Sequence, residues 1–548
     1  MLVDAVIRNA RIWTGDPRRP RADRLALAGG QVLALGEDAE GLRGHLEADL
    51  GGLAVVPGFR DAHAHTAWVG LAMEELDLAS PPRRTLEEVY DAVAEGAAAA
   101  PPGTFVIGSR YDQNKLGGAH PTRDGLDRAA GDRPVWLRHV SGHMSVVNTA
   151  VLERIGDRLT EAGMEGAVGR GEDGAPTGLL QEQAQGLVRD LVVPYPASQL
   201  AGALARAHRR YVAEGVTAVC DAGIGGGLVG HSGVELAAYQ AARDQGGLLA
   251  RTTAMVAAEA LHPLAGHADD GLGTGLDLGL RTGLGDPSLR LGAVKVFADG
   301  SLIGRTCAMH EGFADAPTDR GLYQLAPDEL RGVVLAAHRS GWQVAIHAIG
   351  DAAVDLAVDA YARALQAVPR PGHRHRIEHC GVTSRATLAR IAALGVVPVP
   401  QGGFVSELGD GMARALGPER TRAAYRLASF LEAGVPLPGS SDRPVIGGAP
   451  LSGIQDMVNR RTGSGAAFSP EEAVGPEQAL RAWTWGSAYA CFAEAEAGTL
   501  APGKLADLVV LGDDPTTADP ARIAEIEVLA TLVGGQVVHD RLGLGEGG

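Results

Sequence analysis

Two histidines separated by one residue lie where an apolar stretch near the start of the chain ends. Residues 55–70 read VVPGFRDAHAHTAWVG, which places His63 and His65 after the break at Pro57 and Gly58. In an extended strand, residues i and i+2 point to the same face, so both imidazoles are directed to one point. Two converging neutral imidazoles suit a transition metal. The alternative is a solvated loop that holds two histidines by chance, which is the commoner meaning of an isolated pair.

The centre of the chain alternates apolar strands with helical stretches rich in Ala, Leu and Arg. Helical stretches such as residues 198–215 and 327–341 separate most of the strands. This alternation is typical of repeated βα units, and eight such units predict an α/β fold built on a (β/α)8 TIM-like barrel. The predicted strands are residues 53–59, 217–223, 251–257, 289–300, 342–351, 375–380, 395–401 and 435–442.

Polar residues stand at the carboxyl ends of several of these strands, where the active sites of such barrels are built. We expect them to surround one or two divalent metals. By contrast, His373 and His375 precede the sixth strand and are predicted to be solvated in a loop. The predicted metal set is His63, His65, Lys295, His347, His379 and Asp442.

This set of side chains predicts hydrolysis. Imidazoles and a carboxylate suit zinc, although iron, manganese and nickel accept the same ligands. Zinc with an incomplete set of protein ligands polarises a carbonyl group and lowers the pKa of its bound water to about 7, which makes hydroxide available for attack. Asp442 is predicted to act as general base and general acid, taking a proton from the water and passing it to the leaving group.

Lysine is rare in this chain, and one lysine lies inside an apolar strand. Lys295 is one of three lysines among 49 basic residues, and in VKVFADG it shares a strand face with Phe297 and Asp299. Burial beside a metal would lower the pKa of its amine and leave it free to take up carbon dioxide as a carbamate, an anion able to bridge two metals. Arginine cannot do this. The alternative is an ordinary ion pair between Lys295 and Asp299.

The composition, with 45% hydrophobic and 21% charged residues, is that of a globular protein. A formal net charge of −17 disfavours nucleic acid and anionic membranes as partners, so a small molecule is the expected ligand. The four cysteines have no CxxC spacing, which favours a reducing, cytoplasmic location without disulfides. We expect no signal peptide and no membrane span, since no apolar run reaches about 18 residues. For the oligomeric state, a homodimer is the one alternative to a monomer that we consider.

At 548 residues the chain is long enough for more than one domain. Both ends alternate short apolar runs with turn residues, which predicts a composite β-sandwich of residues 1–56 and 498–548. The barrel is predicted to comprise residues 57–75 and 200–497. Far more residues than one crossover needs separate the first two barrel strands, so residues 76–199 are predicted to form an inserted α+β subdomain that covers the active site.

Six motifs along the chain resemble those of a known family: PGFRDAHAH, VKVFADGSLIGRT, AIHAIGD, RIEHC, SSDRPV and GTLAPGKLADLVVL. Together they resemble the amidohydrolase superfamily, in particular its branch of N-substituted formamide deformylases and related metal-dependent hydrolases. The resemblance extends over nearly the whole chain. It implies that the metal ligands are His63, His65, His347, His379 and Asp442, with Lys295 as a bridging carbamate.

The resemblance also implies residues in or near the substrate pocket. One departure from the family pattern is the seventh strand, VPVPQGGF, where Gln followed by Pro is expected; the change is expected to reshape one wall of the pocket. Lys504, in the last motif, is expected to serve a turn of the sandwich. The positions that match substrate-pocket residues are Asp112, Gln113, His143, Asn148, Glu182 and Arg305.

These observations favour a metal-dependent amidohydrolase that opens the C–N bond of an amide, with an N-substituted formamide as one candidate substrate. A deaminase of an amino-heterocycle on the same scaffold is the nearest alternative, and release of ammonia would distinguish it. The third alternative is a binding protein that keeps the fold without catalysis. The complete set of six predicted ligands argues against it, because a site without function would be expected to lose ligands.

Overall fold

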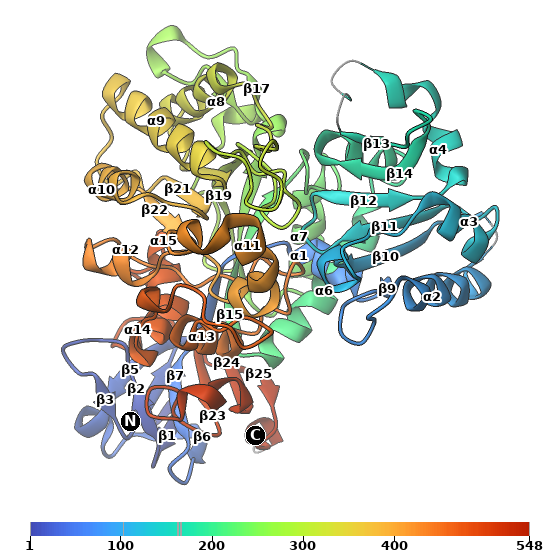
Figure 1. The fold of residues 1–548 in the computed structure, drawn as a ribbon. Helices are drawn as coiled ribbons and strands as arrows, with labels where there is room; N and C mark the ends of the chain where they lie inside the picture. Colours follow the sequence, from blue (N-terminus) through green and yellow to red (C-terminus); the bar gives the residue numbers. More distant parts are fainter. Residues whose placement is uncertain (1, 102, 162–163, 165–166, 547–548) are drawn as a thin grey trace.

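A computed structural model describes residues 2–101, 103–161, 164 and 167–546, and its centre is a parallel sheet that nearly closes on itself (Figure 1). Its seven strands lie in the order β22-β21-β20-β19-β16-β15-β8, and all neighbours are parallel. The fold is therefore mixed α/β with a TIM-like barrel at its centre, as predicted. The strands are β8 (Phe59–Ala64), β15 (Val216–Ile224), β16 (Arg251–Ala257), β19 (Leu289–Phe297), β20 (Val344–Ala348), β21 (Arg376–His379) and β22 (Val397–Val399).

Amphipathic helices pack against the barrel sheet. In α9, the buried side chains of Val354, Val358 and Tyr361 recur at intervals of three and four residues, which directs them to one face. Helix α8 begins with a proline followed by Asp328 and Glu329, residues that stabilise a helix N-terminus. Within the described residues, no helix has both the length and the apolar character needed to cross a membrane. The helices of this part are α1 (Thr66–Ala72), α6 (Ala197–Ala213), α7 (Glu235–Asp244), α8 (Pro327–Arg339), α9 (Asp351–Ala367), α10 (Arg385–Leu394), α11 (Phe404–Thr421), α12 (Ala428–Glu432), α13 (Pro450–Asn459), α14 (Pro476–Arg481) and α15 (Ser487–Ala490).

The first and last predicted barrel strands differ from the structure. The run predicted as strand 53–59 is divided: β7 (Ala54–Pro57) joins a sheet formed by the chain ends, and the barrel strand is β8. Hydrophobic periodicity cannot separate two consecutive buried strands, because both are apolar. The last predicted strand, residues 435–442, is not a regular strand, since Pro436 and Pro438 have no N–H to donate to a ladder.

The segment that follows these prolines still closes the barrel, because its backbone runs beside β8. The Asp442 N–H donates to the His63 carbonyl at 2.7 Å, and the His65 N–H donates to the Arg443 carbonyl at 2.9 Å. We call this junction of residues 439–443 with the end of β8 the barrel seam.

Two sheets lie below the barrel in Figure 1, one built from N-terminal strands alone and one from strands of both chain ends. Strand β23, late in the chain, pairs antiparallel with β7. Buried side chains of both sheets, among them Ile7, Leu508 and Leu532, pack in one cluster. Lys504 Nζ donates to the Ala495 carbonyl at 2.7 Å and so holds the adjacent turn. The sheet orders are β5-β4-β1-β6 and β25-β24-β23-β7-β2-β3, with β1 (Leu2–Arg8), β2 (Arg11–Trp13), β3 (Arg21–Ala22), β4 (Leu25–Ala28), β5 (Gln31–Leu35), β6 (Arg43–Asp49), β23 (Leu508–Leu511), β24 (Val528–Val533) and β25 (Gln536–Asp540).

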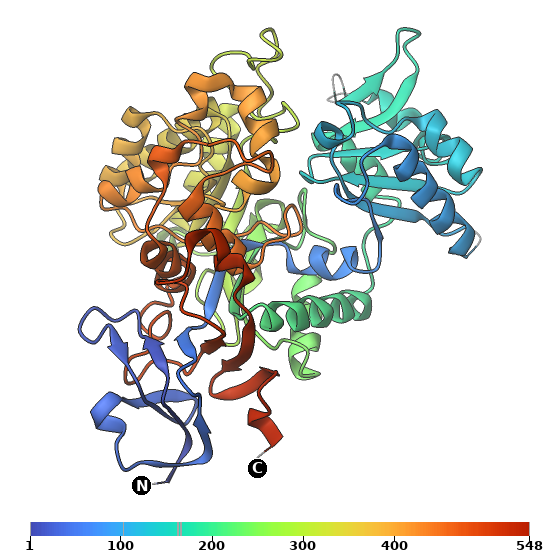
Figure 2. The ribbon, with the colours of Figure 1, turned by 60° about the horizontal axis from the view of Figure 1, so that its bottom comes forward.

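The region between the first two barrel strands stands apart, to the right in Figures 1 and 2, and contains a six-stranded sheet. Its helix α2 begins with a capping box, in which Thr85 and Glu88 each accept the other's backbone N–H. The boundaries of the three predicted units stay a prediction. The sheet order is β13-β14-β12-β11-β10-β9, with β9 (Leu76–Asp77), β10 (Val106–Tyr111), β11 (Val135–His139), β12 (Met144–Val147), β13 (Val168–Arg170) and β14 (Pro176–Gln181). The helices of this region are α2 (Leu86–Ala99), α3 (Arg123–Ala130), α4 (Thr149–Ile155) and α5 (Gln185–Arg189). Outside this region, β17 (His262–Pro263) pairs with β18 (Thr274–Gly275).

Gly70 allows α1 and α6 to touch, and this contact positions the chain directly after His65. A Cβ atom added to Gly70 would lie 1.8 Å from the Ala203 carbonyl oxygen. We therefore expect Gly70→Ala to separate the helices and to destabilise the protein by about 1–3 kcal/mol, measured as a lower thermal midpoint. The matched control is Gly202→Ala in α6, where the nearest atom is Arg206 Nη1 at 3.6 Å, and a small gain of up to about 1 kcal/mol is expected. Equal thermal midpoints for Gly70→Ala and Gly202→Ala would contradict a close contact between α1 and α6 at Gly70.

Candidate metal centre

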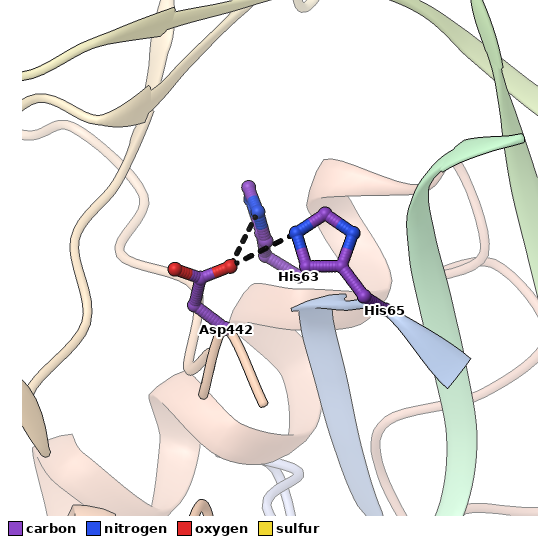
Figure 3. Close-up of side chains that lie close together, drawn as sticks. All are labelled: His63, His65 and Asp442. Carbon is purple, nitrogen blue, oxygen red and sulfur yellow. Dashed lines mark ion pairs between the residues drawn. The ribbon is translucent and has the colours of Figure 1, made fainter. Parts of the chain in front are cut away.

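Three side chains from two distant parts of the sequence meet at the barrel seam (Figure 3). His63 lies in β8, His65 directly follows it, and Asp442 lies in the segment beside it. Asp442 Oδ1 is 3.1 Å from both His63 Nε2 and His65 Nε2. One ligand atom of each side chain lies within 4.8 Å of the others, and all three residues are buried. The arrangement can hold a divalent metal.

His347 and His379 lie beside this trio. The ring centroid of His379 is 5.1 Å from that of His63 and 4.5 Å from that of His347. The Nε2 atom of His347 contacts the Gly300 carbonyl at 3.1 Å, which leaves Nδ1 for another partner. Burial lowers the pKa of His65 to about 4 and the pKa of His379 to about 3. These imidazoles are therefore neutral near pH 7, which is the form that binds metals.

Lys295 projects from β19 into the same buried region. Its side chain is 1% exposed, and its Nζ atom has no hydrogen-bond partner in the part of the chain that the structure describes. Nζ lies 4.8 Å from the ring centroid of Phe297. The alternative ion pair with Asp299 is not formed, because Asp299 accepts three backbone N–H bonds instead. Burial lowers the pKa of Lys295 to about 8, so the amine loses its proton more readily.

Glu378 and Arg376, which were not predicted from sequence, hold His63 in place. Both lie on β21 two residues apart and therefore share one face of the strand. Glu378 Oε2 contacts His63 Nδ1 at 2.5 Å, and Arg376 donates two bonds of 2.7 and 2.9 Å to Glu378. Burial acts to raise the pKa of Glu378, but Arg376 and His63 outweigh it and hold this pKa below its usual range. The carboxylate thus fixes the His63 ring through Nδ1 and leaves Nε2 directed to Asp442.

A second polar side chain orients His379. Gln401 Oε1 bonds to His379 Nδ1 at 2.7 Å, and the Gln401 amide donates to Ser440 Oγ at 3.1 Å. Gln401 belongs to the stretch VPVPQGGF that departs from the family pattern, and Gly402 follows it. A Cβ atom at Gly402 would lie 2.4 Å from Met457 Cγ. The glycine therefore allows α13 to approach the back of the site.

Two residues of the site have left-handed backbone conformations that are uncommon outside glycine. The φ angle is 58° at Asp442 and 67° at His379. Side chains alternate along a strand, so a regular β21 would direct His379 away from the face that Glu378 occupies. The positive φ ends this alternation at the residue whose ring must reach the site. Such conformations cost about 1–3 kcal/mol each and are characteristic of functional sites.

The inserted region contributes His143, which lines the site, and Glu182, which bonds to His143. His143 Nδ1 contacts Glu182 Oε2 at 2.9 Å, and the His143 ring centroid is 5.0 Å from that of His347. Burial alone would lower the pKa of His143, but the Glu182 carboxylate raises it. This imidazole therefore carries a proton more readily than the ligand candidates do.

The other residues predicted for the substrate pocket do not line the cavity beside the trio, although Asp112 lines the larger cavity next to it. The Asn148 amide bonds to two backbone groups of the inserted region, which ties β11 to the start of α4. Arg305 forms an ion pair with Asp315. Gln113 bonds to a histidine of the inserted sheet, and Asp112 caps the turn that follows it. The structure thus places His143 in the lining of the inner cavity and bonds Glu182 to it, whereas Asn148 and Arg305 do not line this cavity.

A small cavity beside the trio adjoins a larger one. The inner cavity has a volume of about 30 Å³ and is lined by Asp442, His347 and His379 together with apolar side chains of α11. The outer cavity, of about 700 Å³, lies between the inserted region and the barrel, and it shares Ile303 and Leu408 with the inner one. The inner volume is large enough to hold water. Ile303 and Leu408 therefore lie where the two cavities adjoin.

The buried ligand atoms fit a cation. His63 Nε2 lies 3.1 Å from Asp442 Oδ1 without forming a hydrogen bond. His65 Nδ1 and Lys295 Nζ also have no hydrogen-bond partner among the described residues. Each buried polar atom without a hydrogen bond lowers the stability of the fold by about 1–3 kcal/mol. A group of such atoms at one place therefore indicates a site that binds a ligand. Imidazole nitrogens with a carboxylate oxygen are the ligands of zinc and related metals.

Comparison with known proteins gives matches along nearly the full chain. The model of the amidohydrolase family matches residues 47–539. The N-substituted formamide deformylase of Arthrobacter pascens is 30% identical over 98% of this chain and 99% of its own length. Protein LONG AFTER FAR-RED 3 of Arabidopsis thaliana is 32% identical over 98% of this chain and 92% of its own. The crystal structure of an uncharacterized metal-dependent hydrolase from Pyrococcus horikoshii has a TM-score of 0.72 at 25% identity and covers 94% of this chain and 99% of that chain.

Proposed function

Since this chain belongs to the amidohydrolase family and is a metal-dependent hydrolase, we propose that it cleaves the C–N bond of an amide. N-substituted formamides are the first candidate substrates, and the similarity to a deformylase over the full length supports them. The observation that carries the proposal is the convergence of His63, His65 and Asp442 on one buried point at the barrel seam.

We assign one or two divalent metals, zinc in the first instance, to this point. When bound, the metal supplies Lewis acidity to a carbonyl oxygen and lowers the pKa of water to about 7. Glu378 and Gln401 fix the rings of His63 and His379 and keep one nitrogen of each available. The proposed ligands are His63, His65, Lys295, His347, His379 and Asp442.

Asp442 carries the proposed proton transfer. Its Oδ1 atom contacts His63 and His65, and Oδ2 remains available to accept a proton from water. The same oxygen then delivers this proton to the amide nitrogen as the C–N bond breaks. Among the residues expected to contact substrate, His143 has the strongest support, because it lines the inner cavity and is held by Glu182.

The test of this function is elemental analysis of the purified protein followed by a substrate screen. We expect bound divalent metal, loss of activity on dialysis against a chelator, and its return with zinc or manganese. The screen comprises formamides, acyl amides, cyclic ureas and amino-heterocycles. Release of a carboxylate and an amine supports the proposal, whereas release of ammonia from a heterocycle identifies a deaminase instead. Protein that neither contains metal nor responds to it would refute both.

Lys295 gives a separate test of the carbamate. We expect Lys295→Ala to bind less metal and to lose most of its activity, because a bridging anion is removed. Added formate or acetate should restore part of both, since a short carboxylate can occupy the vacated space. The readouts are metal per chain, kcat/KM, and a native mass increase of one carbon dioxide in the parent protein. Lys504→Ala, at a turn away from the metal centre, is the control; unchanged activity in Lys295→Ala would exclude a carbamate with a role in catalysis.

A further inference from the structure

A second cluster of reactive side chains lies away from the metal centre, at the amino-terminal ends of the barrel strands. Cys220 in β15 and Cys491, directly after α15, both line a cavity of about 440 Å³. Arg376 extends between them, and its Nη1 atom is 3.7 Å from each of the two sulfur atoms. Cys491 also packs against the buried cluster to which Cys220 belongs. Two cysteines from opposite ends of the barrel sequence are thus held together beside a buried guanidinium.

The chain around Cys491 is held in a fixed position. The Gln343 amide donates to the Ala490 carbonyl at 3.0 Å. Arg374 forms an ion pair with Glu494 and lies 3.9 Å from the ring centroid of Tyr489. Cys220 is only 2% exposed, whereas Cys491 is half-buried and is the more accessible sulfur. A reagent that enters the cavity therefore meets Cys491 first.

The electrostatic surroundings favour the thiolate of Cys491. Its hydrogen bond from Cys220, together with the nearby Arg376, holds the pKa of Cys491 below its usual range although burial opposes this. The thiolate is the form that reacts with oxidants. The other three cysteines differ: Cys491 and burial raise the pKa of Cys220, and burial raises the pKa of Cys307 and of Cys380. The cavity beside Cys491 is also lined by positively charged side chains, which favour a thiolate there. They are Arg281, Arg290, Arg370 and Arg376.

We propose that Cys220 and Cys491 form an oxidative modification site, at which hydrogen peroxide joins the two sulfur atoms in a disulfide. The Cys491 thiolate attacks one peroxide oxygen, the O–O bond breaks, and the departing hydroxide leaves as water after taking a proton. The Cys220 sulfur then attacks the Cys491 sulfenic acid, forming the S–S bond while a second water leaves. Overall the two thiols lose two electrons and two protons, and one peroxide is reduced to two waters.

Oxidation at this site is linked to the metal centre by a continuous chain of polar contacts. Arg376 contacts both sulfurs and also binds Glu378, which in turn fixes His63. A disulfide removes the thiolate that helps to hold the guanidinium, so Arg376 and Glu378 lose part of their positioning. We expect metal affinity to fall by about 10–100-fold, the effect of losing a group that orients a ligand. This consequence rests on the proposed role of His63.

The test begins with the native, reduced protein and stoichiometric hydrogen peroxide, followed by peptide mapping without reduction. The expected product is a Cys220–Cys491 cross-linked peptide that appears before any change at Cys307 or Cys380 and disappears with dithiothreitol. In Cys220→Ser, the sulfenic acid of Cys491 should accumulate and be captured by dimedone, whereas Cys491→Ser should leave Cys220 unmodified. Oxidation of Cys307 or Cys380 at the same rate, or modified Cys491 without the cross-link in the parent protein, would overturn the proposal.

Metal retention is measured separately, so that failure of the proposed metal role can be recognised. The oxidised and reduced proteins are dialysed against the same chelator, and metal per chain is followed with time. Faster loss from the oxidised protein supports the link through Arg376. Equal loss would overturn that link while the mapped disulfide stands, and protein without metal from the outset would refute the proposed function alone.

Discussion

Asp442→Asn is expected to reduce kcat/KM by about 10²- to 10⁴-fold, which is the usual contribution of a general acid–base group. Asparagine has nearly the same shape as aspartate but cannot take up and release the proton. It also removes negative charge from a buried point that His63 and His65 share. The measurement is kcat/KM with the best substrate of the screen at saturating metal, with metal per chain determined on the same sample.

The control for this variant is Asp359→Asn, which changes a carboxylate of α9 that pairs with Arg331 and Arg363 away from the site. Its kcat/KM should match that of the parent. His63→Ala should lose both metal and activity, so comparison with it separates loss of metal from loss of the proton carrier. An Asp442→Asn variant that retains full activity with metal bound would remove Asp442 from the mechanism.

Glu378→Gln is expected to destabilise the protein by about 3–5 kcal/mol, because it leaves one member of a buried ion pair without its partner. Glu378 and Arg376 are at most 1% exposed, and the guanidinium donates two hydrogen bonds to the carboxylate. A neutral amide removes the charge that compensates Arg376 and releases His63 Nδ1. The readout is the denaturant midpoint of the metal-free protein, which isolates stability from metal binding.

A partly exposed ion pair provides the matched control for Glu378→Gln. In Glu494→Gln the broken pair is with Arg374, and side-chain exposures are 18% for Arg374 and 23% for Glu494. Water compensates such a pair, so we expect a loss of about 1 kcal/mol or less. Equal destabilisation of the two variants would show that Glu378 does not have the buried structural role described here.

The sequence was sufficient to predict the TIM-like barrel and the approach of several polar side chains at the ends of its strands. Strand ends in a barrel converge on one rim, so His63, His347 and His379 come together once the strands are placed. A strand boundary that is misplaced by a few residues leaves the same side chains at the strand end. For this reason the shift of the first strand from 53–59 to β8 did not affect the prediction that these side chains meet.

Residues that act through other residues were not predictable in the same way. Glu378 supports His63 from a strand far away in the sequence, and Gln401 supports His379 across a strand junction. Nothing in local periodicity connects such partners. The available signal was a pair of charged residues, Arg376 and Glu378, two apart in a short buried strand, where an unpaired charge would be too costly.

Two histidines show the limit of composition-based reasoning in loops. His373 and His375 were predicted to be solvated, but both are buried. His375 bonds to the ring of His338 and accepts the Val344 N–H, while His373 contacts the Leu394 carbonyl. The polar sequence around them indicated exposure, whereas packing of α8 and α10 against the strand start determines their burial.

The barrel seam has a consequence for the integrity of the whole chain. The parallel ladder is interrupted there by prolines, and Asp61 holds Ser441 across it from a position 380 residues away in the sequence. A cation bound by side chains from both edges would act as a reversible cross-link that closes a very long ring. Ring closure restricts an unfolded chain more as the ring grows, although only logarithmically. Removing the ion would therefore affect more than chemistry, because the first and last parts of the barrel would lose the bond that joins them.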